Sequence, residues 1–285
     1  MRAFYEHRTY DSEIHISAFK AESINFVAHW HSEIEIIYVC EGRIGVGINS
    51  EYRILESGDI SVCGSNDIHY YDSKGMASNT IIIIFRPEIP GFLNSGHEIP
   101  IPCSAFMDRD YRNNAKTGDK ESGDIKDVFV KIVAEMREKK ELYPGFCSLE
   151  ILRLILLLFR YFPAYRADSE KNDRGNRIPA DVGPMQKALK YIEENFPQEI
   201  SLERISREAN LSRFYFSRLF RKTTGMNFNA YLTRIRIEKA GELIRTTGGT
   251  ITEIAYEAGF SSIRTFNRTF RSVMGCTPQS LRHPV

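Results

Sequence analysis

Three histidines and one glutamate in the first quarter of the chain have residue types and spacing suited to binding chemistry. His29, His31 and Glu35 lie within the run HWHSEIE, and His69 follows further along. Positions 29, 31 and 35 differ by even numbers, so on a β-strand their side chains face the same side. Imidazole and carboxylate groups can hold divalent iron, manganese, zinc or nickel, or can hydrogen-bond a polar small molecule. The pattern predicts a binding site, with a metal ion and an organic ligand as alternatives.

Aromatic residues surround these four positions in the sequence. An aromatic face beside convergent polar groups is what a sugar-like ligand needs, although aromatic residues also simply fill cores. The polar groups could also satisfy one another without a ligand. We favour an organic ligand over a metal ion, and therefore expect no resident metal or cofactor. The predicted effector-binding residues are His29, Trp30, His31, Glu35, Tyr38, His69 and Tyr71.

A second candidate site lies in the last third of the chain, where one pattern occurs twice. The two copies are Ser201–Gly225 and Thr250–Gly275. Matching residues lie 49 positions apart in the first part of each copy and 50 apart in the second. One residue is therefore inserted in the second copy, where a turn gives way to a helix. The matching pairs are Ile205 and Ile254, Ala209 and Ala258, Leu211 and Phe260, Ser212 and Ser261, Phe216 and Phe266, Phe220 and Phe270, and Arg221 and Arg271.

Each copy has the pattern of a short helix, a turn and a second helix. Ser201 and Ser212 suit helix N-caps, and Thr250-x-x-Glu253 is a capping box. The predicted helix between the copies, residues 227–246, spans on the order of 30 Å at about 1.5 Å per residue. One turn of B-DNA is about 34 Å, so the second helices of the two copies can reach successive major grooves.

The face of each second helix that points away from its apolar residues carries the predicted DNA contacts. An exposed aromatic residue among arginines suits thymine methyl groups and sugars, and arginine suits guanine or phosphate. Ser217 is short, so we expect the second copy to carry more of the sequence information at an asymmetric site. The predicted DNA-binding residues are Arg213, Phe214, Ser217 and Arg218, then Arg264, Thr265, Asn267 and Arg268.

Residues 1–110 have the pattern of β-strands. Apolar residues alternate with others over residues 34–38 and 44–48, and Glu41–Gly42 is expected to be a turn between them. The glycines at 42, 45 and 47 are interpreted as strand bends. Thr80–Phe85 contains four isoleucines and should be a strand buried on both faces. Short strands at this density predict a sandwich or a small barrel.

Residues 111–165 are predicted to be mainly helical. Asp110–Gly123 is polar and is expected to be an exposed loop, whereas Val128, Ile132 and Met136 follow helical spacing. Phe146–Phe162 is apolar around most of its surface, so it should be buried on more than one side. We expect an antiparallel helix pair that supports a dimer, with packing inside one chain as the alternative. Residues 166–182 are charged and contain glycine and proline, which predicts a linker.

Charge and cysteine usage restrict the class of protein. Residues 183–285 hold 16 Lys and Arg against 9 Asp and Glu, and residues 1–182 hold 22 against 28. A basic module behind an acidic one is expected when only the basic one contacts phosphate. The five scattered cysteines and the absence of an apolar leader predict a cytoplasmic protein without disulfides. Ile151–Phe162 is too short to span a bilayer.

The second copy of the repeat, EIAYEAGFSSIRTFNRTFRSVMGCTPQSLR, resembles the signature of the AraC/XylS family of transcription regulators over about one hundred residues. Similarly, H-x-H-x3-E-x6-G resembles the first cupin motif, in which those three residues and a later histidine bind a divalent metal. The second cupin motif departs from the pattern at Gly64, Asn66 and Ser73. In the AraC/XylS family the outward residues of both groove helices read bases, and Ile263 stands where relatives carry a polar reader.

The resemblance implies a multi-domain chain with an N-terminal all-β cupin-like barrel, supporting helices, and a C-terminal all-α double helix-turn-helix. The expected ranges are 1–110 for the sensing barrel, 111–165 for helical dimerisation, 166–182 for the linker and 183–285 for DNA binding. We predict a regulator, and more specifically an activator, that binds promoter DNA as a homodimer, responds to a small molecule such as a sugar, and contacts RNA polymerase. It is not expected to be an enzyme. The alternatives are a metal-dependent cupin enzyme fused to a DNA-binding module, and a front module that serves only dimerisation.

Overall fold

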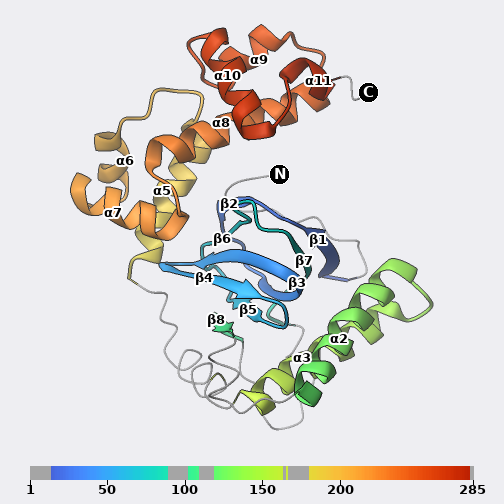
Figure 1. The fold of residues 1–285 in the computed structure, drawn as a ribbon. Helices are drawn as coiled ribbons and strands as arrows, with labels where there is room; N and C mark the ends of the chain where they lie inside the picture. Colours follow the sequence, from blue (N-terminus) through green and yellow to red (C-terminus); the bar gives the residue numbers. More distant parts are fainter. Residues whose placement is uncertain (1–13, 89–101, 109–118, 163–164, 166–179, 283–285) are drawn as a thin grey trace. The chain divides into compact units, whose positions relative to one another are not determined.

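The computed structural model describes residues 14–88, 102–108, 119–162, 165 and 180–282 (Figure 1). The chain divides into two compact units, and the main division falls between Pro179 and Ala180. Most of the predicted linker lies outside the described residues, as do the first thirteen residues. Strand β2 is described with the front unit because it pairs with β6 there.

The front unit is rich in antiparallel strands that meet on one long strand, β3. The first half of β3 pairs with β5 and β7, and its second half pairs with β4 and β6. This arrangement confirms the predicted β-rich architecture of the front module. The strands are β1 (Ile16–Glu22), β2 (Phe26–His29), β3 (Ile34–Ile48), β4 (Glu51–Glu56), β5 (Ile60–Cys63), β6 (His69–Asp72), β7 (Ser78–Phe85) and β8 (Ala105–Met107).

Strand β3 continues without interruption through the position where the sequence predicts a turn. The prediction of a turn at Glu41–Gly42 is wrong. Instead, the pairing with β7 shifts register between Val39 and Glu41, and Gly42 has a φ of 76°. A Cβ on Gly42 would lie 2.0 Å from the carbonyl oxygen of Ala77. The glycine therefore bends one continuous strand rather than ending it.

The glycines at 45 and 47 have a different role from the predicted bends. They make room for two tyrosine rings that cover them. A Cβ on Gly45 would lie 2.2 Å from the hydroxyl of Tyr52, and one on Gly47 would lie 2.0 Å from Cε1 of Tyr70. The two rings stack with their centroids 6.1 Å apart. The glycines are there because large neighbours approach the backbone closely.

The alternation of side chains along β3 and β7 builds two cores. Ile36 and Ile83 belong to the core shared with helices, whereas Ile37 and Ile82 belong to the core between the sheets. Because both faces of β7 are covered, its run of isoleucines is buried throughout, as predicted.

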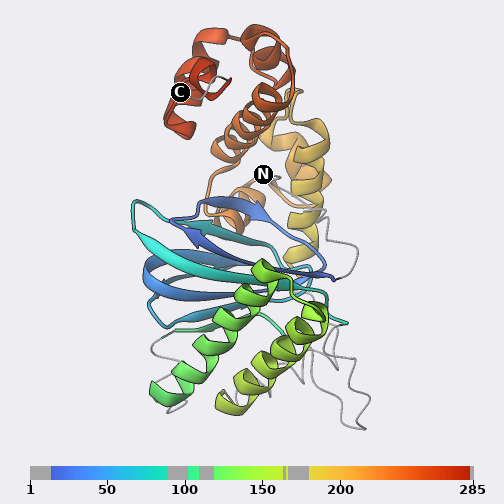
Figure 2. The same cartoon turned by 90° about the vertical axis from the view of Figure 1, so that its right-hand side faces the viewer.

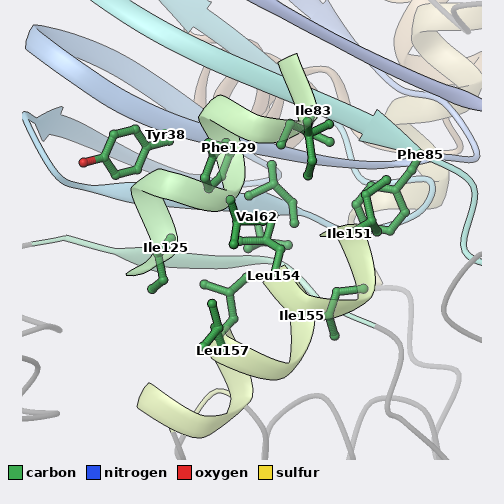
Figure 3. Close-up of a cluster of buried hydrophobic side chains, with 14 of the residues drawn as sticks. Tyr38, Val62, Ile83, Phe85, Ile125, Phe129, Ile151, Leu154, Ile155 and Leu157 are labelled. Carbon is green, nitrogen blue, oxygen red and sulfur yellow. The ribbon is translucent and has the colours of Figure 1, made fainter. Parts of the chain in front are cut away.

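Two helices cover the outer face of the sheet, α2 (Asp119–Glu138) and α3 (Tyr143–Tyr161). They lie side by side in Figure 2, and Figure 3 shows Phe129 of α2 and Leu154 of α3 meeting Val62 and Ile83 of the strands. The strands and helices therefore share one core within a single compact unit. The part of the predicted loop that follows residue 118 belongs to α2 and is helical.

The C-terminal unit is entirely helical. Side-chain caps open its helices as the sequence predicts: Ser201 and Ser212 accept backbone hydrogen bonds, and Thr250 forms a complete capping box with Glu253. The helices are α5 (Val182–Asn195), α6 (Leu202–Glu208), α7 (Arg213–Thr224), α8 (Phe228–Thr246), α9 (Ile251–Glu257), α10 (Ile263–Met274) and α11 (Pro278–Arg282). Helices α6–α7 and α9–α10 are the two helix-turn-helix units, joined by α8.

The structure corrects the alignment of the two copies at one position. Ser262, not Ser261, caps α10, as Ser212 caps α7. The inserted residue is therefore Ser261, which lies in the turn. The residues of α7 and α10 consequently align 50 positions apart, so Ile263 corresponds to Arg213 and Arg264 to Phe214.

Candidate nucleic-acid interface and sensor site

Helices α7 and α10 each bury one face and expose the other. Phe216 and Phe220 are fully buried under α7, and Phe266 and Phe270 under α10. By contrast, Phe214 on α7 is 82% exposed. All eight predicted DNA-binding side chains are exposed: Arg213, Phe214, Ser217, Arg218, Arg264, Thr265, Asn267 and Arg268.

The arginines on these exposed faces differ from several others in the C-terminal unit. Arg204 pairs with Glu208 on α6, and Arg234 pairs with Glu238 on α8. Within the described part of the chain, no carboxylate pairs with the arginines of α7 or α10. Positive charge that is not neutralised by neighbouring acids is available to phosphate or to base edges.

Each exposed face is also hollowed. A groove of about 950 Å³ runs beside α10 and is lined by residues including Asn267, Arg268 and Arg271. A second groove of about 580 Å³ beside α7 is lined by Phe214, Ser217, Arg218, Arg221 and Lys222. The grooves thus add Arg221, Lys222 and Arg271 to the predicted set. Arg221 and Arg271 are a matching pair of the repeat, and that recurrence was the signal that could have identified them.

A hydrogen bond holds α7 at its start. The hydroxyl of Tyr215 donates to Asp181 over 3.0 Å, and the guanidinium of Arg218 lies 5.5 Å from the centre of the Tyr215 ring. The bond to Asp181 raises the pKa of the Tyr215 hydroxyl. Arg218 is therefore positioned over a ring that is itself held in place.

In the front unit, Glu35 is the centre of a buried polar cluster. Its carboxylate lies 3.2 Å from Nε2 of His31 and 3.6 Å from Nε2 of His69, and it accepts a hydrogen bond from the hydroxyl of Tyr71. His29 completes the group, and one ligand atom of each of the three histidines and of Glu35 lies within 4.8 Å of the others. The structure therefore brings together five of the seven predicted effector-binding residues.

The charge of Glu35 is set by competing effects. Burial alone raises the pKa of its carboxyl group, but hydrogen bonds and charge interactions from His31 and His69 outweigh burial. The pKa is held well below its ordinary value, so the carboxylate is ionised at neutral pH.

The other ring nitrogen of each histidine in the cluster lies beside a backbone carbonyl. Nδ1 of His29 is 3.0 Å from the oxygen of Val27, and Nδ1 of His31 is 3.2 Å from that of Glu33. Nδ1 of His69 is 3.0 Å from the oxygen of Asp67. A carbonyl only accepts, so these contacts favour a proton on Nδ1 of each ring, while Nε2 of His31 and of His69 faces Glu35. This donor set fits a divalent metal, because ligating histidines commonly donate their other N–H to a carbonyl.

The prediction for Tyr38 is wrong. Tyr38 follows Glu35 by an odd number of residues on β3, so its side chain faces α2 and α3 instead of the cluster (Figure 3). Its ring lies 5.3 Å from that of Phe129. The alternation of the strand was the signal that separates it from Glu35. Trp30, the remaining predicted residue, is buried.

The fold and the two sites define a DNA-binding protein with a separate sensing domain. Residues 14–155 match the AraC-like ligand binding domain, and residues 205–283 match a helix-turn-helix domain. The chain belongs to the AraC family of transcription regulators.

Two curated proteins and one solved structure illustrate what this chain is similar to. The chain is 36% identical to the regulatory protein PocR of Salmonella typhimurium over 120 residues, which cover 42% of this chain and 39% of PocR. It is 23% identical to the transcriptional activator RhaS of Escherichia coli over 259 residues, which cover 90% of this chain and 88% of RhaS. Among solved structures, ToxT of Vibrio cholerae matches 95% of this chain and 99% of its own, with 15% identity and a TM-score of 0.43.

Hydropathy adds one finding about the helices. Among the described residues, none of the helices combines the length and the apolar character needed to cross a bilayer.

Proposed function

We propose that this protein is a transcriptional activator that binds promoter DNA as a homodimer under the control of a small-molecule effector. The observation that carries the proposal is the pair of capped helices, α7 and α10, whose exposed arginines pair with none of the carboxylates that the structure describes. The name of RhaS as an activator supports activation in preference to repression. An activator acts by contacting RNA polymerase, which we propose as a further partner.

The length of α8 supports simultaneous binding by both helices. Its 19 residues span about 28 Å at about 1.5 Å per residue, which is close to one turn of B-DNA. Mapping the genomic binding sites of the full chain tests the proposal. We expect sites upstream of genes whose transcription falls when the protein is deleted. Sites whose genes rise on deletion would instead indicate repression.

Replacing Arg268 by alanine should separate base reading from phosphate contact. Loss of an arginine–guanine pair weakens binding to the best duplex by about 1–3 kcal/mol and relaxes preference at one base pair. Arg271→Ala should weaken all duplexes alike and lower the salt slope by about 1. Arg207→Ala, in an ion pair on α6, is the control and should change neither. Titrations of labelled duplexes at several salt concentrations measure both effects. An Arg268 variant that loses affinity equally for every sequence would make that residue a phosphate contact.

We propose a sugar as the effector and the polar cluster of the front unit as its site. The cluster supplies an ionised carboxylate, three imidazoles and the Tyr71 hydroxyl, which suit a ligand rich in hydroxyl groups. Calorimetric titration of the full chain with a panel of monosaccharides tests this, with the Tyr71→Phe variant as the matched comparison. Binding that is equal in both proteins would place the effector elsewhere.

An exposed apolar stripe on α3 supports the homodimer. Phe146, Leu149 and Leu156 follow helical spacing and are 53%, 61% and 44% exposed. Side chains three, four and seven positions apart lie along one face of a helix, as at helix–helix interfaces. The opposite face of α3 is buried against the sheet and α2, so this stripe is available to a second copy.

A charge in the centre of this stripe should dissociate the dimer. We expect Leu149→Lys to weaken self-association by at least about tenfold, because an ammonium group is costly to bury without a partner. Val130→Lys on α2 is the control, since Val130 is also exposed, at 44%, but lies on the other helix. Sedimentation velocity over a concentration series measures the change. A dimer that survives Leu149→Lys would have its interface on another surface.

The second candidate function is a metal-dependent front domain, and the convergence of four ligand atoms within 4.8 Å of one another favours it. His29, His31, Glu35 and His69 would hold the ion, and a bound divalent metal would act there as a Lewis acid. Under this reading we expect about one transition-metal ion per chain by elemental analysis, and loss of that metal in Glu35→Gln. His15→Gln, an exposed histidine in the same unit, should retain it. Protein that takes up no metal after incubation with zinc, iron, manganese and nickel salts would leave the sugar site as the function of the cluster.

A further inference from the structure

The short connection between α5 and α6 is held by an arginine from α8. Arg236 donates from Nε to the carbonyl oxygen of Phe196 and from Nη2 to that of Gln198, both over 2.8 Å. The planar guanidinium thus hydrogen-bonds the backbone on both sides of Pro197. A lysine ammonium group does not reproduce this geometry.

The same connection is contacted from the second helix-turn-helix unit. Gly259, in the turn between α9 and α10, has a φ of 85°. A Cβ at this position would lie 2.6 Å from the carbonyl oxygen of Pro197 and 2.9 Å from that of Phe196. Glycine is therefore required both for the backbone conformation and for the close approach. Asn210 occupies the matching turn of the first unit, with a φ of 55°.

The two helix-turn-helix units are consequently joined at two places. One is the body of α8, and the other is the Phe196–Gln198 connection. Two parts joined by one helix can swing about its ends, whereas a second contact removes most of that freedom. We propose that Arg236 and Gly259, acting on Phe196–Gln198, fix the distance and angle between α7 and α10. They thereby set the number of base pairs between the two sequences that the protein reads. Both are positioning residues, and the second statement rests on the proposed reading of DNA by both helices.

The expected effect follows from the geometry of DNA. One inserted base pair moves the second sequence by about 3.4 Å and turns it by roughly 35°, since a B-DNA turn of about 34 Å contains about ten base pairs. A rigid pair of helices cannot follow that shift without losing contacts. A pair released at Phe196–Gln198 follows it more easily, but makes the native contacts less well.

The test measures spacing preference in the full chain. The duplex is the tightest binder selected from a random-sequence library, and its variants carry one base pair added or removed between the two recognised segments. For the natural protein we expect at least about a tenfold loss of affinity on either change. For Arg236→Met we expect weaker binding to the parent duplex and a preference that falls to about threefold or less. Arg236→Lys and Gly259→Ala should shift the preference in the same direction. Arg234→Met is the matched control, because Arg234 lies on the same helix but pairs with Glu238, and it should keep the natural preference.

A second measurement does not depend on DNA. Labels introduced through unnatural amino acids at Lys222 on α7 and Ser272 on α10 report the distance between the reading helices. We expect the distance distribution to broaden in Arg236→Met and Arg236→Lys but not in Arg234→Met. An unchanged distribution in a folded Arg236 variant, or affinity that falls by one factor at every spacing, would overturn the inference. If the natural protein ignores changes to the second DNA segment while the distribution still broadens, only the proposed reading by both helices fails.

Discussion

Glu35→Ala is expected to destabilise the front unit by about 3–5 kcal/mol, which is the range for breaking a buried ionic pair from one side. The carboxylate is 2% exposed and is contacted by His31, His69 and the hydroxyl of Tyr71. Without it, these polar groups face a void in which water must replace their partner. Urea unfolding of the full chain, followed by a probe in the front unit, measures the loss.

Two variants define the origin of this effect. Glu35→Gln keeps the volume, can accept from Tyr71 and can still hydrogen-bond Nε2 of His31 through its amide group, so we expect a much smaller loss. Glu41→Ala removes an exposed glutamate from the same strand and should cost less than about 0.5 kcal/mol. If Glu35→Gln were as damaging as Glu35→Ala, the negative charge itself would be required, as it would be in a metal site.

Gly42→Ala is expected to be comparably damaging, at about 2–6 kcal/mol, for reasons confined to the backbone. A non-glycine residue with φ near 76° costs about 1–3 kcal/mol. The added methyl group would lie 2.0 Å from the carbonyl oxygen of Ala77, and forcing the two strands apart costs about 1–3 kcal/mol more. Denaturant unfolding measures the sum.

Gly75→Ala separates the two contributions. Gly75 has almost the same φ, 77°, but a Cβ there would meet nothing within 4 Å. We therefore expect about 1–3 kcal/mol from the conformational cost alone. Equal losses in the two variants would mean that the strands at Gly42 yield without cost, and that the bend in β3 tolerates a side chain.

The C-terminal unit follows closely from the sequence because its determinants are local. Helical spacing of apolar residues, serine and threonine caps and the two turns act within a few residues, and they are present twice. The outward positions of α7 and α10 follow from the same period. One shift was missed, at Ser261, because a single inserted residue can be placed on either side of a serine pair when only residue identities are compared.

The fold of the front unit was harder to predict from the sequence, because paired strands lie far apart in the chain. Glu41 and Gly42 have the composition of a turn. They stay within one strand because β7 pairs with the first half of β3, up to Gly42, and β6 pairs with its second half. The role of Gly45 likewise depends on the ring of Tyr52, which arrives from a neighbouring strand.

By itself, the sequence determined the class of this protein: a repeated helix-turn-helix unit behind a β-rich ligand-binding domain, with the exposed faces of both copies. Periodicity and capping are properties of contiguous residues, so they can be seen without coordinates. The tertiary structure alone decided that Tyr38 faces away from the cluster, that Nε2 of His31 and of His69 converge on Glu35, and that Arg236 and Gly259 meet at one connection. Each of these depends on groups far apart in the chain, whose distances are set by packing and not by sequence spacing.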